Sequence, residues 1–281
     1  MSTTGRPDSW AITSPRSDRV KRIAALSGRS ARRRHGRFRV EGPQAVRSLL
    51  QHRAQAVREL YVTFDGADAA PEILDLAETS GITAREVSSE ILRAMTRGED
   101  PADGMASPQG VLAVADIAQR SLTDVLTGLP SGPATVLVLH EVQDPGNVGT
   151  LIRAADASGA DAVLATTGTA DFHAPKVVRS ATGSLFHLPV VTGIAPEALF
   201  SELRDAGVSV LATSGYAESD LYAAKLPSRS AWVMGNEARG LPESVLADAD
   251  LAVRIPLAGD AESLNVAIAA TVCLFETLRR R

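Results

Sequence analysis

Three short polar segments in the second half of the chain contain residue types suited to binding and orienting a small ligand. They read DPGNVGTLIR at 144–153, VMGNEARGLP at 233–242, and IPL at 255–257 followed by ESLNVA at 262–267. Glycines in the first two segments let another group approach the backbone closely. Asparagine, serine, glutamate and arginine supply the hydrogen-bonding groups that orient a substrate. The combination predicts a binding site made of loops.

The first segment is predicted to turn from a strand into a helix. Gly146 and Gly149 leave room beside the backbone, and Asn147 is the predicted N-cap of the helix. Arg153 follows six residues later, nearly two helical turns on, so both polar side chains are expected on related faces. A plain strand–turn–helix joint with a cap and a surface arginine would have the same pattern, which leaves both interpretations open.

The second and third segments each have a structural alternative as well. Two glycines flank Asn236-Glu237, and such a turn can surround an adenine or a ribose with backbone groups. It could equally be a loop that begins a helix, with Glu237 favoured by the helix dipole. Ser263 and Asn265 stand at the start of the C-terminal helix, where free N–H groups gather, and Ser263 is a candidate N-cap. All three segments at strand ends of one sheet favour a shared site.

The elements that must position these segments alternate regularly along residues 134–281. Strands are predicted over 135–140, 162–165, 188–191, 208–213, 231–234 and 251–255, and helices over 147–158, 174–182, 196–206, 242–247 and 264–280. Continuous apolar strands between helices predict an α/β domain with a mostly parallel sheet covered on both faces. Binding sites in such sheets lie beyond the carboxyl ends of the strands, which is where the three segments are expected.

The first part of the chain predicts a smaller α/β domain. Strands are expected over 38–42, 60–64 and 110–115, helices over 44–52 and 71–80, and a strand end with a helix over 87–95. A Gly- and Pro-containing stretch then indicates a linker. The predicted organisation is a flexible basic arm at 1–17, a first domain at 18–115, a linker at 116–133 and a second domain at 134–281.

Positive charge is concentrated at the N-terminus. Residues 1–40 contain eleven Lys or Arg and two Asp, a net charge of +9, and because the whole chain carries −4 the remainder carries −13. A basic segment on an acidic body indicates contact with a polyanion, although a solvated tail would have the same composition. Aromatic residues are scarce, so phosphate contacts are favoured over stacking. The arginines predicted to contact this polyanion are Arg29, Arg32, Arg33, Arg34, Arg37 and Arg39.

Composition and missing motifs exclude several other classes. Cys273 is the single cysteine, so no intrachain disulfide can form, and a reducing cytoplasm is expected. No apolar run approaches the length of a membrane span, and the N-terminus has no signal-peptide pattern. The five histidines and one cysteine show no metal-ligand spacing, so no metal is expected. Neither a Walker loop nor the Gly-x-Gly-x-x-Gly fingerprint is present, which argues against a Rossmann-type methyltransferase or oxidoreductase.

The three segments resemble, over about residues 133–281, the signature motifs of the SpoU-like (TrmH-type) branch of the SPOUT RNA methyltransferases. Residues 38–115, with FRVEG at 38–42, are similar to the ribosomal-protein-like substrate-binding domain that often precedes this catalytic domain. The resemblance implies a C-terminal trefoil knot, a homodimer with its active site at the subunit interface, and S-adenosylmethionine bound in a bent form without a metal.

The resemblance also assigns expected roles to individual residues. The polar catalytic cluster would be Asn147, Arg153, Glu237, Ser263 and Asn265. The cofactor pocket would be formed by Thr213, Ser214, Gly215, Met234, Gly235, Asn236, Gly240, Ile255, Pro256, Leu257 and Leu264. The chain departs from the family pattern at Ala238, where glycine is common, and at His140-Glu141, where an acidic residue often stands at the earlier position. We expect His140 to pack at a strand end rather than to act as a base.

The implied activity is S-adenosylmethionine-dependent methylation of a ribose 2′-hydroxyl, with 23S ribosomal RNA as the expected substrate. A transfer-RNA 2′-O-methyltransferase and a non-catalytic RNA-binding ribosome-assembly factor are the alternatives. The family mechanism often makes Arg153 the general base. Because a guanidinium is essentially always protonated, clamping a phosphate and stabilising the developing alkoxide suit its chemistry better.

Overall fold

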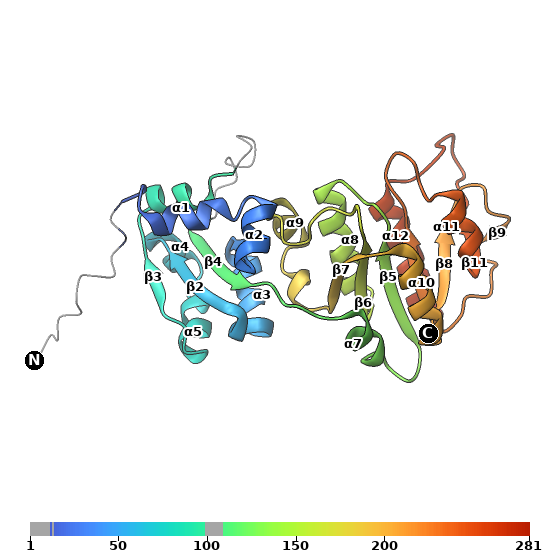
Figure 1. The fold of residues 1–281 in the computed structure, drawn as a ribbon, viewed down its shortest axis with the longest axis horizontal. Coiled ribbons are helices and arrows are strands. Elements are labelled where there is room, and N and C mark those ends of the chain that lie inside the picture. Colours follow the sequence, from blue (N-terminus) through green and yellow to red (C-terminus); the bar gives the residue numbers. More distant parts are fainter. Residues whose placement is uncertain (1–11, 13, 99–108) are drawn as a thin grey trace, which may run out of the picture. The chain divides into compact units, whose positions relative to one another are not determined.

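The computed structural model describes residues 12, 14–98 and 109–281, which form two compact units. The first unit contains the described residues up to Ala118 together with residues 173–179, and the second contains residues 119–172 and 180–281. Figure 1 follows the chain through both units in colour. Residues 1–11 and 13 of the predicted arm lie outside the described residues.

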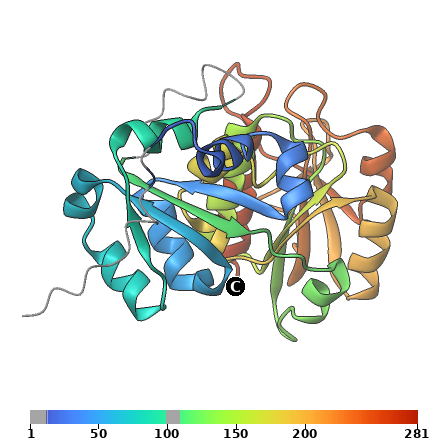
Figure 2. The ribbon, with the colours of Figure 1, turned by 60° about the vertical axis from the view of Figure 1, so that its left-hand side comes forward.

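The first unit is built on a four-stranded sheet in the order β1-β4-β2-β3. Strands β1 and β2 run antiparallel to β4, while β3 runs parallel to β2 (Figure 2). Its elements are α1 (Asp18–Ala25), α2 (Arg29–His35), β1 (Arg37–Glu41), α3 (Pro43–Arg53), a 3₁₀ turn (Ala54–Ala56), β2 (Val57–Val62), α4 (Phe64–Ala69), α5 (Glu72–Thr79), β3 (Ala84–Glu86), α6 (Ser89–Thr96) and β4 (Val111–Asp116).

Helix α1 is packed into this unit, with Val20 and Ile23 buried in a core cluster with residues of α6, and β1 belongs to the sheet. One sequence expectation is wrong here. The strand expected to reach residue 64 ends at Val62, because the hydroxyl of Thr63 accepts a hydrogen bond from the Gly66 amide and starts α4. Local capping overrides the strand preference of the following phenylalanine.

The second unit contains a seven-stranded sheet in the order β7-β6-β5-β10-β8-β11-β9, in which every described pairing is parallel. Its elements are α7 (Leu122–Thr127), β5 (Ala134–Leu139), α8 (Pro145–Ala157), β6 (Ala162–Thr166), the end of α9 (Pro175–Ala181), a 3₁₀ turn (Ser184–Phe186), β7 (Val190–Ile194), α10 (Pro196–Asp205), β8 (Ser209–Thr213), β9 (Ser219–Asp220), β10 (Arg229–Met234), α11 (Glu243–Asp248), β11 (Leu251–Arg254) and α12 (Val266–Arg279).

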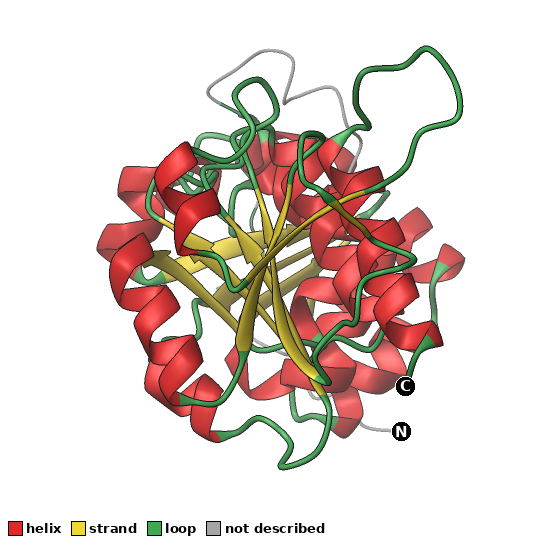
Figure 3. Cartoon of the chain, turned by 90° about the vertical axis from the view of Figure 1, so that its right-hand side faces the viewer, coloured by secondary structure: helices red, strands yellow, loops and turns green. Residues whose placement is uncertain are grey.

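Alternation along the central strands accounts for helices on both faces of this sheet (Figure 3). Ala231 and Val233 of β10 belong to a core cluster with residues of α7, α10 and α11. Trp232, between them, points to the other face, where its indole N–H donates to the hydroxyl of Thr277 in α12 at 2.9 Å. Because successive strand residues point to opposite faces, a sheet covered on both sides needs continuously apolar strands.

Parallel strands bring the segments that follow them to one edge of the sheet. The first polar segment follows β5, the second follows β10, and residues 255–257 follow β11. Strand β10 lies between β5 and β8, and β11 lies on the other side of β8. The sheet therefore presents all three segments at its carboxyl edge. No helix in the described part of the chain is long and apolar enough to cross a membrane.

Candidate functional site

The loop after β5 turns into α8 through a cap on its first residue. The Asp144 carboxylate accepts a hydrogen bond from the Asn147 amide at 2.8 Å, and Pro145 occupies the first helical position. Asp144 is therefore the N-cap, and the prediction that Asn147 caps this helix is wrong. Aspartate followed by proline is a strong signal for the start of a helix, so Asp144-Pro145 could have identified the cap from the sequence. The side chain of Asn147 is left available for other contacts.

Glu237, in the loop after β10, fixes the loop after β5. Its carboxylate accepts hydrogen bonds from the amides of Gln143 at 3.1 Å and Asp144 at 2.9 Å, and from the side-chain amide of Asn147 at 3.1 Å. Helix α11 begins only at Glu243, so the alternative that Glu237 lies in the first turn of a helix is wrong. Partial burial raises the pKa of Glu237, but hydrogen bonds from Asn147 and the backbone outweigh it and lower the pKa overall.

Asn265 extends this hydrogen-bonded group to the start of α12. Its side-chain amide donates to the side-chain oxygen of Asn147 at 3.0 Å, while its own oxygen accepts from the Ala267 and Ile268 amides. Asn265 is thus the N-cap of α12, and the alternative of Ser263 as the cap is wrong because its neighbour two residues on takes that role. Three predicted site residues, Asn147, Glu237 and Asn265, form one continuous chain of hydrogen bonds.

Two other predicted catalytic residues are exposed. Arg153 lies on α8, and Ser263 lies just before α12. Neither side chain has a hydrogen bond or ion pair with the residues that the structure describes. Within the described part of the chain, the Arg153 guanidinium on α8 is therefore an unpaired cation. A free guanidinium is suited to an anionic group, such as a phosphate or a developing alkoxide.

The loop after β10 is a closed, tightly packed turn. Asn236 and Gly240 exchange backbone hydrogen bonds of 3.1 and 2.8 Å, and the Asn236 side chain accepts from the amides of Ala238 and Arg239. A Cβ on Gly235 would lie 2.5 Å from the Gly240 carbonyl carbon, so only glycine fits there without moving the loop. This close approach gives the predicted cofactor residues Gly235, Asn236 and Gly240 a fixed shape.

The other predicted cofactor residues line the same edge of the sheet. Met234 ends β10 and is buried, and the hydroxyl of Thr213, at the end of β8, lies 3.8 Å from its sulfur. The Ser214 amide donates to the Val253 carbonyl of the neighbouring β11. Gly215, Pro256 and Leu257 are exposed, whereas Ile255 and Leu264 are half-buried. The predicted residues that follow β8, β10 and β11 are therefore adjacent in the order of the strands.

His140 and Glu141 join the loops after β5 and β10 to the sheet. His140 is buried, with its Nδ1 3.4 Å from the hydroxyl of Thr166, and burial lowers its pKa. This agrees with the expected packing role. Glu141 has a positive φ of 53°, accepts the Asn236 side-chain amide on its carbonyl at 2.9 Å, and pairs with Arg239 at 2.8 Å. Glu141 and Arg239 were missed because their pairing joins loops 98 residues apart.

Two of the six arginines predicted to contact RNA are corrected. Arg39 is fully buried in the first unit and forms an ion pair with Glu41 at 2.7 Å. Arg32 is 3% exposed and donates to the carbonyl of Leu26 near the end of α1. Both guanidinium groups serve the fold of the unit. Arg29, Arg33 and Arg34 of α2 are exposed, as is Arg37 of β1, which pairs with Asp116.

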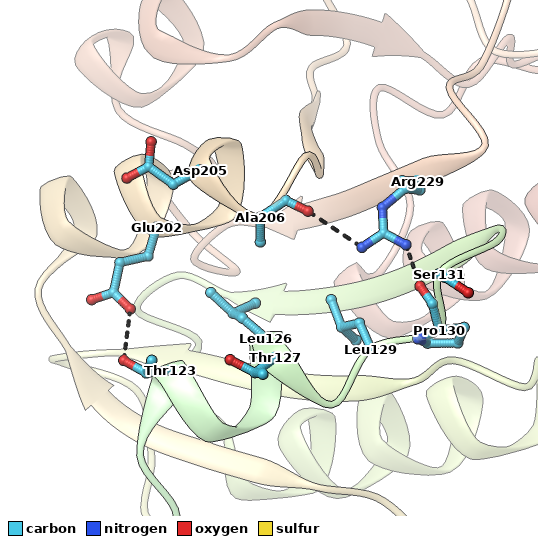
Figure 4. A pocket seen from close by; sticks show the side chains of 10 residues that line it. All are labelled: Thr123, Leu126, Thr127, Leu129, Pro130, Ser131, Glu202, Asp205, Ala206 and Arg229. Atoms are coloured by element: carbon cyan, nitrogen blue, oxygen red, sulfur yellow. Dashed lines mark hydrogen bonds between the residues drawn. The ribbon is translucent and has the colours of Figure 1, made fainter.

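The second unit also has a cavity of about 620 Å³ at the opposite, amino edge of its sheet (Figure 4). Residues of α7, the following loop and α10 line it, together with Arg229 at the start of β10. Arg229 is already engaged by the carbonyls of Gly132 and Ala206. The cavity is thus separated by the length of the strands from the polar cluster. Among the described residues, no group of three or more His, Cys, Asp or Glu could hold a metal ion.

Comparison with known proteins matches both parts of the chain. The model of the SpoU rRNA methylase family matches residues 134–275, and the model of an MRM3-like substrate-binding domain matches residues 17–113. A 23S rRNA (guanosine-2′-O-)-methyltransferase, RlmB, of Ralstonia nicotianae is 35% identical over 241 residues, covering 85% of this chain and 94% of that protein. The 23S rRNA guanosine 2′-O-methyltransferase RlmP of Bacillus subtilis is 33% identical, covering 94% and 97%.

Solved structures agree with these relatives. An AdoMet-bound rRNA methyltransferase from Sinorhizobium meliloti superposes with a TM-score of 0.80 at 29% identity, covering 96% of this chain and 97% of that one. The SpoU methyltransferase AviRb from Streptomyces viridochromogenes, in complex with AdoMet, has a TM-score of 0.79 at 30% identity, covering 95% and 98%. These matches confirm the predicted fold class, while the trefoil knot stays a prediction. The chain belongs to the SpoU rRNA methylase family.

Proposed function

We propose that this protein transfers a methyl group from S-adenosylmethionine to a ribose 2′-hydroxyl of 23S ribosomal RNA. The observation that carries the proposal is the hydrogen-bonded chain Glu237–Asn147–Asn265 at the carboxyl edge of the parallel sheet. Asn147 lies on α8, the helix that also holds Arg153, whose guanidinium has no partner among the described residues. Relatives that align with most of the chain are named as 23S rRNA 2′-O-methyltransferases, which supports this substrate over transfer RNA.

The loops at this edge fit the methyl donor. S-Adenosylmethionine offers an adenine, a ribose and an amino-acid group, which backbone groups of exposed loops can bind. Gly215, Gly240 and Leu257 are exposed in three loops at this edge, and the closed turn at 235–240 has a fixed shape. When bound, the sulfonium supplies an electrophilic methyl group with a good leaving group. We assign the cofactor pocket to 213–215, 234–236, 240, 255–257 and 264.

The protein's own residues then have to position and activate a weak nucleophile. Arg153 would contact the 2′-hydroxyl oxygen and a flanking phosphate, stabilising negative charge as the hydroxyl loses its proton. Asn147 and Asn265, held by Glu237, would orient the ribose, and Ser263 stands exposed beside them. Fixed alignment of acceptor and methyl group supplies much of the rate of such a transfer.

RNA binding is assigned to the first unit, at 18–115, with α2 as the main cationic surface. Arg29, Arg33 and Arg34 are exposed on this seven-residue helix. Phosphate contacts by such side chains make binding fall with rising salt. Replacing the three with glutamine should therefore flatten the salt dependence of RNA affinity, and an unchanged slope would remove α2 from the interface.

We also propose a cytoplasmic homodimer in which α12 lies at the interface. Ile268, Phe275 and Leu278 are 54%, 43% and 42% exposed and lie on one face of the helix by their spacing. Exposed apolar side chains aligned along a helix are typical of a surface covered by a partner. Sedimentation at micromolar concentration should report a dimer, and a monomer would contradict this assignment.

The substrate is tested by labelling. RNA from a strain that lacks the gene is incubated with the protein and tritiated S-adenosylmethionine, then separated into 23S, 16S and transfer RNA. We expect label in 23S RNA alone, on free RNA or on assembling large subunits. Label in transfer RNA would overturn the substrate while keeping the enzyme class. Cofactor binding without any label in RNA or particles would favour the non-catalytic alternative.

A further inference from the structure

Glu141, directly after β5, has a backbone conformation that its residue type rarely adopts. Its φ is 53°, in the left-handed region, where glycine is at ease and a residue with a Cβ is strained. Such strain persists only where the surroundings hold the residue in place, and it is concentrated at functional positions. A glycine would make the same turn without strain, but it would lack the carboxylate of Glu141.

The amide, the carbonyl and the carboxylate of Glu141 each form a hydrogen bond with a neighbouring residue. Its amide donates to the hydroxyl of Thr166 at 3.3 Å, its carbonyl accepts from the side chain of Asn236 at 2.9 Å, and its carboxylate accepts from Arg239 at 2.8 Å. Gly168 leaves the space for this side chain, because a Cβ there would lie 3.1 Å from Cγ of Glu141. Both the backbone and the carboxylate of Glu141 therefore contact the loop at 235–240.

Two carboxylates connect these loops in opposite directions. Glu237 reaches from the loop after β10 to the amides and Asn147 of the loop after β5, and Glu141 reaches back from the loop after β5 to Arg239. Arg239 lies within the turn closed by the hydrogen bonds between Asn236 and Gly240. Holding its side chain in place therefore also restrains the conformation of the turn.

The Glu141–Arg239 pair is poorly placed to stabilise the fold. The two side chains are 39% and 68% exposed, and exposed ion pairs contribute little to the free energy of unfolding. A weak pair at a strained residue can still select one local loop conformation among several of similar energy. Its effect should therefore appear in the binding of a ligand to the loop rather than in global stability.

We propose that Glu141 and Arg239 are positioning residues that hold the turn at 235–240 in the conformation that binds S-adenosylmethionine. The inference rests on the proposed cofactor pocket. It adds Glu141 and Arg239 to the residues assigned to cofactor binding and catalysis. It also offers a functional reason for the strained backbone of Glu141.

The test compares Glu141→Gln, Arg239→Gln, the double variant and the reversed pair Glu141→Arg/Arg239→Glu with wild type. Calorimetry gives the Kd of S-adenosylmethionine, steady-state kinetics gives KM for cofactor and for unmodified 23S RNA, and urea unfolding gives stability. Each single variant should raise the cofactor Kd about two- to five-fold, the gain that an ion pair of this exposure supports. The RNA KM and the urea midpoint should stay near wild type, the double variant should be no worse than a single one, and the reversed pair should recover part of the loss.

Glu141→Gly separates positioning from a structural role. Removing the strain should leave the urea midpoint unchanged or raise it, while the cofactor Kd rises as in Glu141→Gln. Arg204→Gln, which breaks the ion pair with Asp250 at the amino edge of the sheet, is the matched control and should leave the cofactor Kd unchanged.

Three results would overturn the inference. The cofactor Kd could stay within two-fold of wild type in both single variants, or Glu141→Gly could lose stability and affinity together. Arg239→Gln could also raise the RNA KM alone, which would place this side chain against the substrate. A wild-type protein that binds no S-adenosylmethionine would instead refute the proposed function itself.

Discussion

Replacing Glu237 with alanine should damage activity far more than stability. The carboxylate accepts three N–H groups, from Gln143, Asp144 and Asn147, at 2.9–3.1 Å. Hydrogen bonds to a charged acceptor contribute about 1.5–3 kcal/mol each when buried. Glu237 is exposed, so in the alanine variant water can accept hydrogen bonds from the N–H groups that lose the carboxylate. We therefore expect a loss of only about 1 kcal/mol in the free energy of unfolding.

The catalytic loss should be larger because Asn147 would lose the partner that fixes its side chain. A displacement of about 1 Å in a positioning group can reduce the rate about 100-fold, which corresponds to about 2.7 kcal/mol in the activation free energy. Methyl transfer to unmodified 23S RNA gives kcat/KM, and urea unfolding gives stability. Glu237→Gln keeps an accepting oxygen without the charge, so its activity should lie between that of wild type and that of Glu237→Ala.

Glu243→Ala is the matched control, since Glu243 is an exposed carboxylate in the first turn of α11, six residues away. It should lower stability by at most about 1 kcal/mol, the helix-dipole contribution, and leave kcat/KM near wild type. If Glu237→Ala kept wild-type activity, or lost activity only in proportion to unfolding, the positioning role of this residue would be refuted.

Three further predictions test separate features. Arg153→Ala should keep the cofactor Kd and lower turnover about 100- to 1,000-fold, as loss of an oxyanion-stabilising group does, measured by methyl transfer and calorimetry. Gly235→Ala should weaken cofactor binding and cost about 1–3 kcal/mol of stability, because its Cβ would lie 2.5 Å from the Gly240 carbonyl carbon. Hydrogen bonds from Arg279 lower the pKa of Glu276 from its ordinary 4.5 to about 2, so its contribution to stability should be present above pH 4.5 and be lost as pH falls towards 2 in acid unfolding.

Each of these has a control and a contradicting result. Arg153→Ala with near wild-type turnover would show that this guanidinium does not act in the reaction. Gly259→Ala, at a glycine with no neighbour within 4 Å of an added Cβ, should be harmless, and equal damage at both glycines would contradict the close-packing argument. Glu276→Gln should remove part of the stability gained between pH 2 and 4.5, and an unchanged acid-unfolding curve would disprove the ion-pair contribution.

The sequence predicted the parallel sheet and its carboxyl edge because both depend on local patterns. Apolar runs of strand length between helical segments were sufficient to place β5, β10 and β11, and polar loops directly follow them. The cap residues were harder to choose. Several short polar side chains stand at each helix start, and only long-range contacts decide between them: Glu237 and Asn265 both bind Asn147, which leaves Asp144 to cap α8.

Charge was misread for a similar reason. Arg39 looked like part of a basic surface because its neighbours in sequence are basic, but its strand position places it inside the first unit beside Glu41. Composition reports how many arginines a segment has and not which of them face solvent. The Glu141–Arg239 pair was equally hidden, because neither residue is unusual in its own segment and the strain at Glu141 exists only in the folded chain.

The position of the methyl group within the modified nucleotide tests the central claim most directly. Tritium-labelled 23S RNA from the wild-type reaction is hydrolysed in alkali, and the products are separated by size and charge. A 2′-O-methyl ribose cannot take part in alkaline cleavage, so the account predicts all label in an alkali-resistant dinucleotide. Label in mononucleotides would mean methylation of a base, and would contradict the assignment of Arg153, Asn147 and Asn265 to a ribose hydroxyl.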